Sequence, residues 1–350
     1  MRIFSGIQPT GRKHLGNYIG AIAQYVSSQE RGDGIFCIVD LHAITVAYDP
    51  VELRERLYDT TAILLAAGLD PRRCILFRQS DVHEHTELTW LLSSVTELGR
   101  LQRMHQFRDK SLAQRELVSA GLLVYPVLQA ADVLAYRAHE VPVGEDQREH
   151  LELMRDVARR LNARFGGGEE ILVVPEHRIP EVGARIMDLQ EPTRKMSTTG
   201  GSELGTVYVL DEPKAIEKKL KSAVTDSGSE VRRDADKPGV SNLIEILAAA
   251  RGADPATIEA EFAQARYGEL KQAVAAGVID YLAPVRERYE RLRGDEVALE
   301  AILADGAARA QAIAAETLAD VRERMGVGPP QRGGGNQSAG TSASAATVRG

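Results

Sequence analysis

Short apolar runs and longer amphipathic segments follow one another along the first 210 residues. The apolar runs predict buried strands at 2–7, 36–45, 74–79, 139–144 and 170–175. The segments between them have helical spacing of their apolar residues and predict helices at 21–30, 51–69, 85–99, 124–138 (beginning after Pro126) and 145–165. Strands separated by helices of this length indicate an α/β fold, in which a parallel sheet is covered by helices on both faces. Ligands of such sheets bind beyond the carboxyl ends of the strands.

The pattern changes near residue 211. From there to about residue 326 the chain is rich in Ala, Glu, Leu and Arg, and its apolar residues keep helical spacing. The last segment, 327–350, consists mainly of small and polar residues and predicts a disordered tail. We therefore expect a Rossmann-like parallel-sheet domain over 1–210, a mainly helical domain over 211–326, and the tail.

Composition narrows the class of protein. Of the 350 residues, 43% are hydrophobic and 27% are charged, and the formal net charge of −7 argues against nucleic-acid binding through a global positive field. Cys37 and Cys74 lie in apolar runs, which favours buried, reduced thiols over a disulfide or a metal site. No apolar run reaches the length of a membrane span, and no signal-peptide pattern opens the chain. We expect a cytoplasmic protein with no membrane partner.

Residues 9–20, PTGRKHLGNYIG, lie where the first predicted strand leads into a helix. Glycine lets a ligand approach the backbone closely, and the free N–H groups of a helix N-terminus attract anions. The stretch is not a P-loop, because Arg12 and Lys13 stand where that motif needs Lys and then Ser or Thr. It is not the G-x-G-x-x-G loop of dinucleotide-binding folds either. It therefore predicts an anion site of another kind.

A second polar stretch, TRKMSTTGG at 193–201, gives this loop a partner. His14-Leu-Gly-Asn17 and Lys195-Met-Ser-Thr-Thr199 resemble the HIGH and KMSKS motifs with which class I aminoacyl-tRNA synthetases bind ATP. Further segments resemble those of the bacterial tryptophanyl-tRNA synthetase family, in its order: FSGIQPTG, GNYIGA, CIVDLHAITV, VPVGEDQ, GARIMDL and AVTDS. The resemblance runs from residue 2 to about residue 326. It implies an enzyme that activates L-tryptophan with ATP to tryptophanyl-adenylate and pyrophosphate, then charges tRNA(Trp).

The resemblance also implies the nucleotide site. Catalytic roles would fall on His14, Asn17, Lys195 and Ser197. ATP would contact Gln8, Pro9, Thr10, Gly16, Asn17, Gly144, Glu145, Asp146, Ile186, Lys195, Met196, Ser197, Thr198 and Thr199. In-line attack of a carboxylate on the α-phosphate builds charge on phosphoryl oxygens, so positioning and electrostatic stabilisation supply most of the catalysis. Mg²⁺ is expected on the phosphates rather than in a protein metal site.

A tryptophan pocket follows from the same resemblance. Its residues would be Phe4, His42, Tyr125, Gln129, Asp132, Val143 and Gln147. Asp132 would accept the indole N–H, and a site built for one specific hydrogen bond discriminates by ~10⁴ or more. Tyr125 and Gln147 would hold the α-amino group, and Phe4 and Val143 would form apolar walls. A structural role is the alternative for Ile186, Met196, His42 and Asp132.

Two positions depart from the family pattern. Thr198 replaces the second lysine of KMSKS, so one cation is missing or is supplied elsewhere, with Arg108 and Lys110 as candidates. Gln129 stands where the family commonly has Met facing the indole. Burying an amide without partners costs about 1–3 kcal/mol, so Gln129 would bond to Asp132 or a nearby carbonyl, or face the ring. We hypothesise a pocket that tolerates indole-bearing inhibitors, with a modest loss of tryptophan affinity.

Other functions stay open at this point. Tyr125, Gln129 and Asp132 have the Y-x-x-x-Q-x-x-D spacing of tyrosyl-tRNA synthetases, which places them on one helical face. Phe4 and the segments GEDQ and GNYIGA favour tryptophan instead. A nucleotide-binding regulatory paralogue with weak charging activity would keep the fold, although an intact His14 argues against it. An adenylating enzyme that uses no tRNA would not need the helical half.

The resemblance finally implies partners. The helical domain would read the anticodon, and the protein would be a homodimer in which each tRNA contacts both subunits. The segments KAIEKKLK (214–221) and RERYERLR (286–293) supply Lys and Arg for phosphates and Tyr289 for stacking. A solvated helix face is the alternative for both segments.

Overall fold

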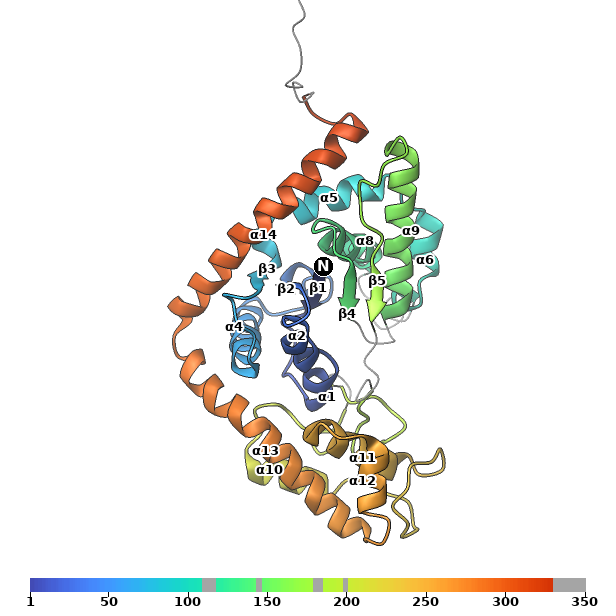
Figure 1. Cartoon of the computed structure of the whole chain (residues 1–350), viewed down its shortest axis with the longest axis vertical. Coiled ribbons are helices and arrows are strands. Elements are labelled where there is room, and N and C mark those ends of the chain that lie inside the picture. Colours follow the sequence, from blue (N-terminus) through green and yellow to red (C-terminus); the bar gives the residue numbers. More distant parts are fainter. Residues whose placement is uncertain (109–117, 143–146, 179–184, 198–200, 330–350) are drawn as a thin grey trace, which may run out of the picture.

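The computed structural model of the chain describes residues 1–108, 118–142, 147–178, 185–197 and 201–329. Within these residues, five strands form one sheet in the order β3-β2-β1-β4-β5, and every neighbouring pair is parallel. The strands are β1 (Arg2–Ile7), β2 (Asp33–Ile38), β3 (Ile75–Arg78), β4 (Glu140–Pro142) and β5 (Glu176–Arg178). The predicted α/β fold with a parallel, Rossmann-like sheet is confirmed (Figure 1).

Helices cover both faces of this sheet. They are α1 (Leu15–Asn17), the π-helix η1 (Tyr18–Ile22), α2 (Ala23–Ser28), α3 (Asp40–Ala43), α4 (Pro50–Ala67), the 3-10 helix η2 (Gln79–Asp81), α5 (Glu84–Ser93), α6 (Leu98–Arg103), α8 (Ala120–Leu134) and α9 (Arg148–Phe165). In β2, Phe36 and Ile38 belong to the hydrophobic cluster that includes α2 and α4. Ile35 and Cys37 belong to the cluster that includes α5, α8 and α9. This alternation buries both sides of the strand, as continuous apolar runs predict.

The strand predicted at 170–175 is wrong in position, because β5 begins at Glu176. The backbone N–H groups of Ile171 and Leu172 donate to Asn162 Oδ1 at 3.0 and 2.9 Å, and Asn162 Nδ2 donates to the Leu172 carbonyl at 2.7 Å. These bonds tie the apolar run to α9 instead of to a neighbouring strand. The apolar pattern indicates that the run is buried, but it does not determine where the backbone groups find partners.

Two other boundaries need correction. The run 36–45 is a strand only as far as Ile38, since the chain then turns into α3, where Leu41 N donates to Gln79 Oε1 at 3.0 Å. The helix expected to begin after Pro126 begins at Ala120, and the Ser119 hydroxyl caps it by accepting from Leu122 N at 3.1 Å. Proline removes one backbone donor inside α8, and the helix continues because most of its residues from 125 onward are buried.

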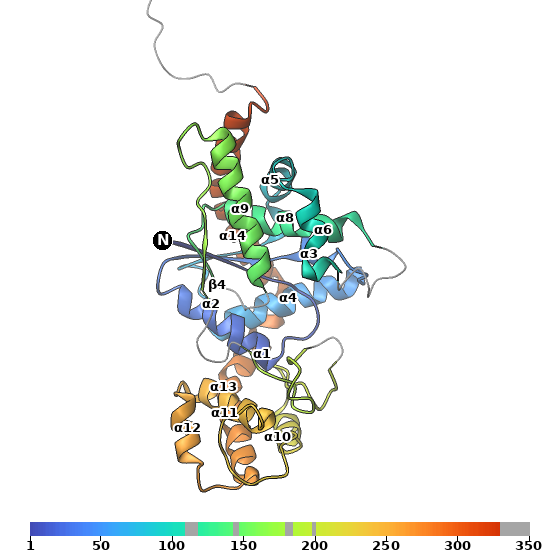
Figure 2. The same ribbon diagram turned by 90° about the vertical axis from the view of Figure 1, so that its right-hand side faces the viewer.

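The second half of the chain forms a separate group of helices beside the sheet domain (Figure 2). These helices are α10 (Pro213–Lys221), α11 (Pro238–Arg251), α12 (Pro255–Glu261) and α13 (Tyr267–Arg293). The last helix, α14 (Glu296–Met325), runs back along the sheet domain and packs on β3 and α5 (Figure 1). A Cβ on Gly306 would lie 1.8 Å from the Leu76 carbonyl oxygen, so glycine permits this close approach. The expected domain over 211–326 thus includes one helix that packs on the sheet.

Asp59 on α4 joins the two parts of the molecule. The Tyr289 hydroxyl donates to Asp59 Oδ1 at 2.9 Å, and Arg293 Nε donates to the same oxygen at 2.8 Å. Arg293 also pairs with Glu55. Tyr289 and Arg293 belong to the segment 286–293 that the sequence suggests for tRNA contact, and in the structure they are engaged at this junction.

In the described part of the chain, no helix combines the length and the apolar character that crossing a membrane requires.

Candidate active site

A cavity of about 530 Å³ opens beyond the carboxyl ends of β1, β2 and β4. Two groups of its lining residues contain the positions proposed from the sequence. The first group, the loop wall, consists of Gln8, His14, Gly16, Asn17, Ile186, Lys195, Met196 and Ser197. The second group, the helix wall, consists of Phe4, His42, Tyr125, Gln129, Asp132 and Gln147. Fourteen of the residues proposed from the sequence therefore meet around one space.

His14 and Asn17 hold each other at the start of α1. Asn17 N donates to His14 Nδ1 at 3.2 Å, and His14 N donates to Asn17 Oδ1 at 3.1 Å, a reciprocal capping box. A neutral imidazole that accepts at Nδ1 carries its proton on Nε2. Burial, and then the charges of Lys195 and Lys13, lower the pKa of His14 to about 4. His14 is therefore neutral near pH 7 and can donate from Nε2.

Backbone pairing joins the first motif segment of the loop wall to residues 207–209, which follow the second motif segment in the chain. Leu15 N donates to the Val207 carbonyl at 2.8 Å, and Val209 N donates to the Lys13 carbonyl at 2.9 Å. On the other side, Met196 N donates to the Ile186 carbonyl at 3.0 Å. Residues 207–209 thus lie beside the start of α1. This pairing brings together two segments that lie far apart in the sequence.

Gly16 allows close packing in the loop wall. A Cβ there would lie 3.1 Å from the His14 ring and 3.5 Å from Ile186 Cβ. Behind the loop, Lys13 Nζ donates to the carbonyls of Gln8 and Thr10 at 2.7 and 3.1 Å. Burial, followed by the charge of Arg56, lowers the pKa of Lys13 to about 8. Lys13 therefore shapes the loop from behind, because its ammonium group is engaged with the loop's own backbone.

The helix wall presents three side chains of α8. Tyr125, Gln129 and Asp132 follow one another at helical spacing and line the cavity together. The Tyr125 hydroxyl donates to Gln106 Oε1 at 3.1 Å and lies 2.9 Å from His150 Nε2. Burial, with a contribution from Glu149, raises the pKa of Tyr125 to about 12. The phenol is therefore protonated and polar groups hold it in place.

Gln129 finds its partner in a nearby carbonyl, that of the Gln147 side chain, and not in Asp132. Its Nε2 donates to Gln147 Oε1 at 3.2 Å, and the side chain is only partly buried. The bond links α8 to the residue that precedes α9. Gln129 therefore orients Gln147 and leaves Asp132 to other donors.

Asp132 is 2% exposed and meets three protein donors. His42 Nε2 lies 2.7 Å from Oδ2, while Gln79 Nε2 and His85 Nδ1 lie 2.7 and 2.6 Å from Oδ1. Burial alone would raise the pKa of Asp132, but the charges and hydrogen bonds of His42 and His85 outweigh it and lower the pKa below its usual range. The cavity therefore has a buried carboxylate in its acceptor form. The sequence alternative of a helix Asp bonded to backbone does not describe this residue.

Some proposed residues lie elsewhere. Pro9 and Thr10 are not among the described residues of the lining, and Thr10 contributes only the carbonyl that Lys13 uses. Arg108, suggested as a replacement cation, is likewise absent from the described lining. The remaining proposals lie outside the described residues: Lys110, Val143, Gly144, Glu145, Asp146, Thr198 and Thr199.

Comparison with known proteins places this arrangement in a family. The family described as tRNA synthetases class I (W and Y) matches residues 1–283. The tryptophan–tRNA ligase of Gloeobacter violaceus is 48% identical over 329 residues, which cover 94% of this chain and 97% of that protein. The chain belongs to this class I tRNA synthetase family. The resemblance found in the sequence is thereby confirmed.

Solved structures of such class I tRNA synthetases share the fold. Tryptophanyl-tRNA synthetase from Mycoplasma pneumoniae has a TM-score of 0.86 at 35% identity, covering 93% of this chain and 98% of that one. The Campylobacter jejuni enzyme, complexed with ADP and tryptophan, has a TM-score of 0.77 at 34% identity, covering 93% of this chain and 100% of that one. The described residues of this synthetase contain no cluster of three or more His, Cys, Asp or Glu side chains that could hold a metal ion.

Three residues that line or support the cavity were not predicted from the sequence. Gln106 lines the cavity and supports Tyr125, and His85 with Gln79 supports Asp132. The segment QSDVHEH directly follows the carboxyl end of β3, where a parallel sheet places its ligands. Polar side chains at that end of a buried strand were the available signal. Gln106 gives no comparable signal, because its position depends on how the chain packs after α6.

Proposed function

We propose that this chain activates L-tryptophan with ATP, releases pyrophosphate and transfers the amino acid from tryptophanyl-adenylate to tRNA(Trp) for protein synthesis in the cytoplasm. The observation that carries the proposal is that His14, Lys195 and the buried carboxylate of Asp132 line one cavity. The name of the 48% identical relative and the ligands of the Campylobacter structure support tryptophan and a nucleotide as the ligands. The relative's name and the bound ligands also favour tryptophan over tyrosine as the substrate, and they favour an enzyme over a nucleotide-binding paralogue.

The loop wall would carry the phosphates. His14 Nε2–H and the Asn17 amide donate to phosphate oxygens, and the Lys195 ammonium meets the pyrophosphate as negative charge develops on it. These groups are hydrogen-bond donors, which fit phosphate oxygens and not a cation. Mg²⁺ would therefore be held by the phosphates and water, where it neutralises charge as ATP is cleaved.

The helix wall would carry the amino acid. Asp132 Oδ2 keeps acceptor capacity beyond its bond to His42, and an indole N–H is a donor that fits it. Tyr125 and Gln147 face the same cavity and would hold the α-amino group, with Phe4 as an apolar wall. Ile186 and Met196 are 2% and 1% exposed and would contact adenine with the part of each side chain that lines the cavity.

Exchange of labelled pyrophosphate into ATP, measured with each amino acid in turn, tests this proposal. Exchange that depends on tryptophan, followed by charging of tRNA(Trp), is the expected result. Exchange that depends on tyrosine instead would indicate a tyrosyl-tRNA synthetase. Nucleotide binding without exchange for any amino acid would indicate a binding paralogue, and exchange without charging would remove the tRNA from the proposal.

The partners we propose are tRNA and a second copy of the chain. In α10, Lys219 is buried against Asp211 and Glu203, whereas Lys214 and Lys218 are exposed and could meet phosphates.

For the dimer, the support is Trp90 on α5, which is 79% exposed. Tryptophan is enriched at protein interfaces, and a side chain of this size exposes much apolar surface when left uncovered. Sedimentation of Trp90→Ser beside the wild type tests this: a wild-type dimer and a weakened variant dimer are expected, and a wild-type monomer would contradict it.

A further inference from the structure

Two buried side chains, His85 and Tyr136, stand directly behind Asp132. Both are fully buried, and neither is in the cavity lining as described. His85 Nδ1 lies 2.6 Å from Asp132 Oδ1, and its Nε2 lies 2.6 Å from the Tyr136 hydroxyl. The Tyr136 ring also stacks on Phe4, with ring centroids 5.5 Å apart. One line of contacts therefore joins Tyr136 to two residues of the helix wall.

The Tyr136 hydroxyl sets the tautomer of His85. Burial, followed by the nearby Cys37, Asp132 and Glu84, raises the pKa of Tyr136 well above its usual value, so the hydroxyl keeps its proton. In the neutral form of His85, Nε2 accepts that O–H at 2.6 Å and the ring proton lies on Nδ1, whereas in the protonated form both nitrogens carry a proton. Nδ1 donates to Asp132 in either form. Tyr136 thus keeps the neutral form of His85 a donor toward the carboxylate.

This arrangement controls how many acceptor positions Asp132 offers to a ligand. An ionised carboxylate has about four acceptor positions, and His42, Gln79 and His85 occupy three of them. The position that remains suits a single donor. A protonated carboxyl would instead carry an O–H of its own, which could donate to a ligand that has no ring N–H.

We propose that His85 and Tyr136 are positioning residues that keep Asp132 an acceptor-only anion, so that the cavity selects amino acids whose ring carries an N–H. The inference rests on the proposed function, in which Asp132 meets the indole of tryptophan. Neither residue touches the substrate, and both act through Asp132. The selectivity of the site then depends on a hydrogen-bond line that runs outward from the cavity to α5.

The titratable groups around Asp132 decide how its ionisation responds to pH. Those that interact with Asp132 are His42 of α3, His85 of α5, Cys37 of β2 and Tyr136 after α8, and Glu84 of α5 acts on Tyr136. Without His85, burial still opposes the anion while one of the groups that favour it is gone, so the carboxyl binds a proton more readily. Tryptophan binding to a His85→Leu variant should therefore weaken at a higher pH than binding to the wild type does as the solution is acidified.

The experiment compares tryptophan with benzothienylalanine, in which sulfur replaces the indole N–H, in pyrophosphate exchange. In the wild type, kcat/KM should strongly favour tryptophan. His85→Leu should reduce that preference by at least about tenfold, with KM for ATP unchanged within about twofold, because a hydrogen bond to a charged group is lost. His85→Asn, whose amide nitrogen can occupy the Nδ1 position, should keep most of the preference. Tyr136→Phe keeps the ring against Phe4 and should reduce the preference less than His85→Leu.

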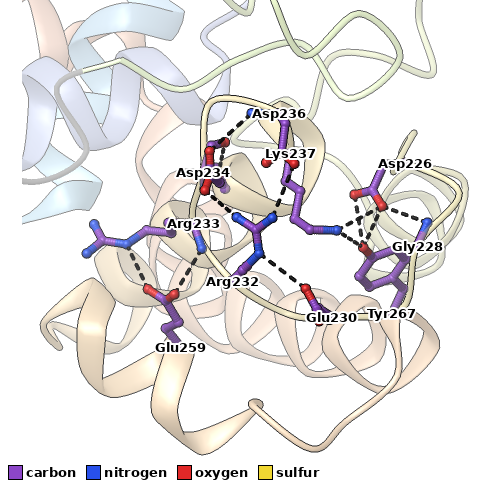
Figure 3. A network of polar contacts seen from close by, with 11 residues as sticks. Asp226, Gly228, Glu230, Arg232, Arg233, Asp234, Asp236, Lys237, Glu259 and Tyr267 are labelled. Carbon is purple, nitrogen blue, oxygen red and sulfur yellow. Dashed lines mark hydrogen bonds and ion pairs between the residues drawn. The ribbon is translucent and has the colours of Figure 1, made fainter.

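Tyr267→Phe is the matched control. Its hydroxyl donates to Asp226 at 2.8 Å and accepts from Lys237 at 3.0 Å, in the network that Figure 3 shows within the helical domain. This variant removes the same group from another polar network far along the chain. It should leave the preference for tryptophan and its pH dependence as in the wild type.

The outcomes separate this inference from the proposed function. A wild type that does not activate tryptophan removes the proposed function. A tryptophan-specific wild type whose His85→Leu and Tyr136→Phe variants lose activity equally for both amino acids overturns only the inference, because the two residues would then be structural. Equal selectivity loss in His85→Asn and His85→Leu, or the same pH dependence of the tryptophan KM in His85→Leu and the wild type, would overturn it as well.

Discussion

The helix wall and the loop wall of the cavity place their polar groups differently. On the helix wall, Asp132 is 2% exposed and protein donors already meet both of its oxygens. On the loop wall, Lys195 and Gln8 are exposed, and the buried His14 is neutral. Burial makes an unmatched polar group expensive and so sharpens recognition, whereas exposed cations can meet phosphates that arrive with water and Mg²⁺. Under the proposed function, selection of the amino acid and catalysis on the phosphate would therefore be carried by different residues.

Lys195→Ala should give the largest effect and should separate the two walls. We expect the rate of pyrophosphate exchange to fall by about 10²–10³-fold, because the Lys195 charge acts where negative charge develops. Tryptophan KM should stay within about twofold of the wild type. Steady-state exchange with varied tryptophan and ATP measures both quantities. A tryptophan KM that rises as much as the rate falls would mean that the loop shapes the amino-acid pocket.

Asp132→Asn should have the second largest effect, confined to the amino acid. We expect KM for tryptophan to rise by about 10–100-fold, since a hydrogen bond to a buried charge is replaced by one to a neutral amide. KM for ATP should change little. The same exchange assay measures both values, and an equal rise for ATP would move Asp132 out of the amino-acid site.

Titration of His14 gives a smaller effect, on stability. Its pKa is about 4 in the fold, below the ordinary histidine value near 6.5. As pH falls below about 6.5, the unfolded chain binds a proton that the folded chain does not, so the free energy of unfolding decreases until about pH 4. Between pH 7 and pH 5, His14→Asn should lose about 1–2 kcal/mol less of this free energy than the wild type. Denaturant unfolding at the two pH values measures this difference. Equal losses in the two proteins would mean that folding does not lower the pKa of His14.

Gln129→Met should give the smallest effect and sharpens the description of the helix wall. The change removes the bond to Gln147 and returns an apolar group to the cavity. We expect indole-bearing inhibitors that use an apolar wall to bind several-fold more tightly, with tryptophan affinity raised by less. Competition assays on both proteins measure the two shifts. Shifts of the same size, or none, would contradict the hypothesis of an inhibitor-tolerant pocket.

The sequence predicted the elements and the motifs well because each has a local signal. The apolar runs marked β1, β3 and β4, and the helical spacing of Tyr125, Gln129 and Asp132 placed them on one face. The run at 170–175 misled because burial and strand pairing are separate properties. There, the side chain of Asn162 supplies the partners that a strand would otherwise provide.

The supporting residues of the site were harder to predict. His85 and Gln79 reach Asp132 only after β3, α5 and α8 have packed together, and no spacing in the sequence encodes that meeting. The return of α14 to the sheet is similar, because its small residues around Gly306 look like those of any Ala-rich helix. Long-range packing determined these positions.

A double variant tests the central claim most directly. If the two walls act separately, the free-energy loss in kcat/KM for tryptophan of Asp132→Asn with Lys195→Ala should equal the sum of the single losses within about 0.5 kcal/mol. The measurement is pyrophosphate exchange at limiting tryptophan for the wild type, the two single variants and the double variant. A double variant no worse than the weaker single variant would show that the residues act as one unit, and would contradict the separation of selection from catalysis.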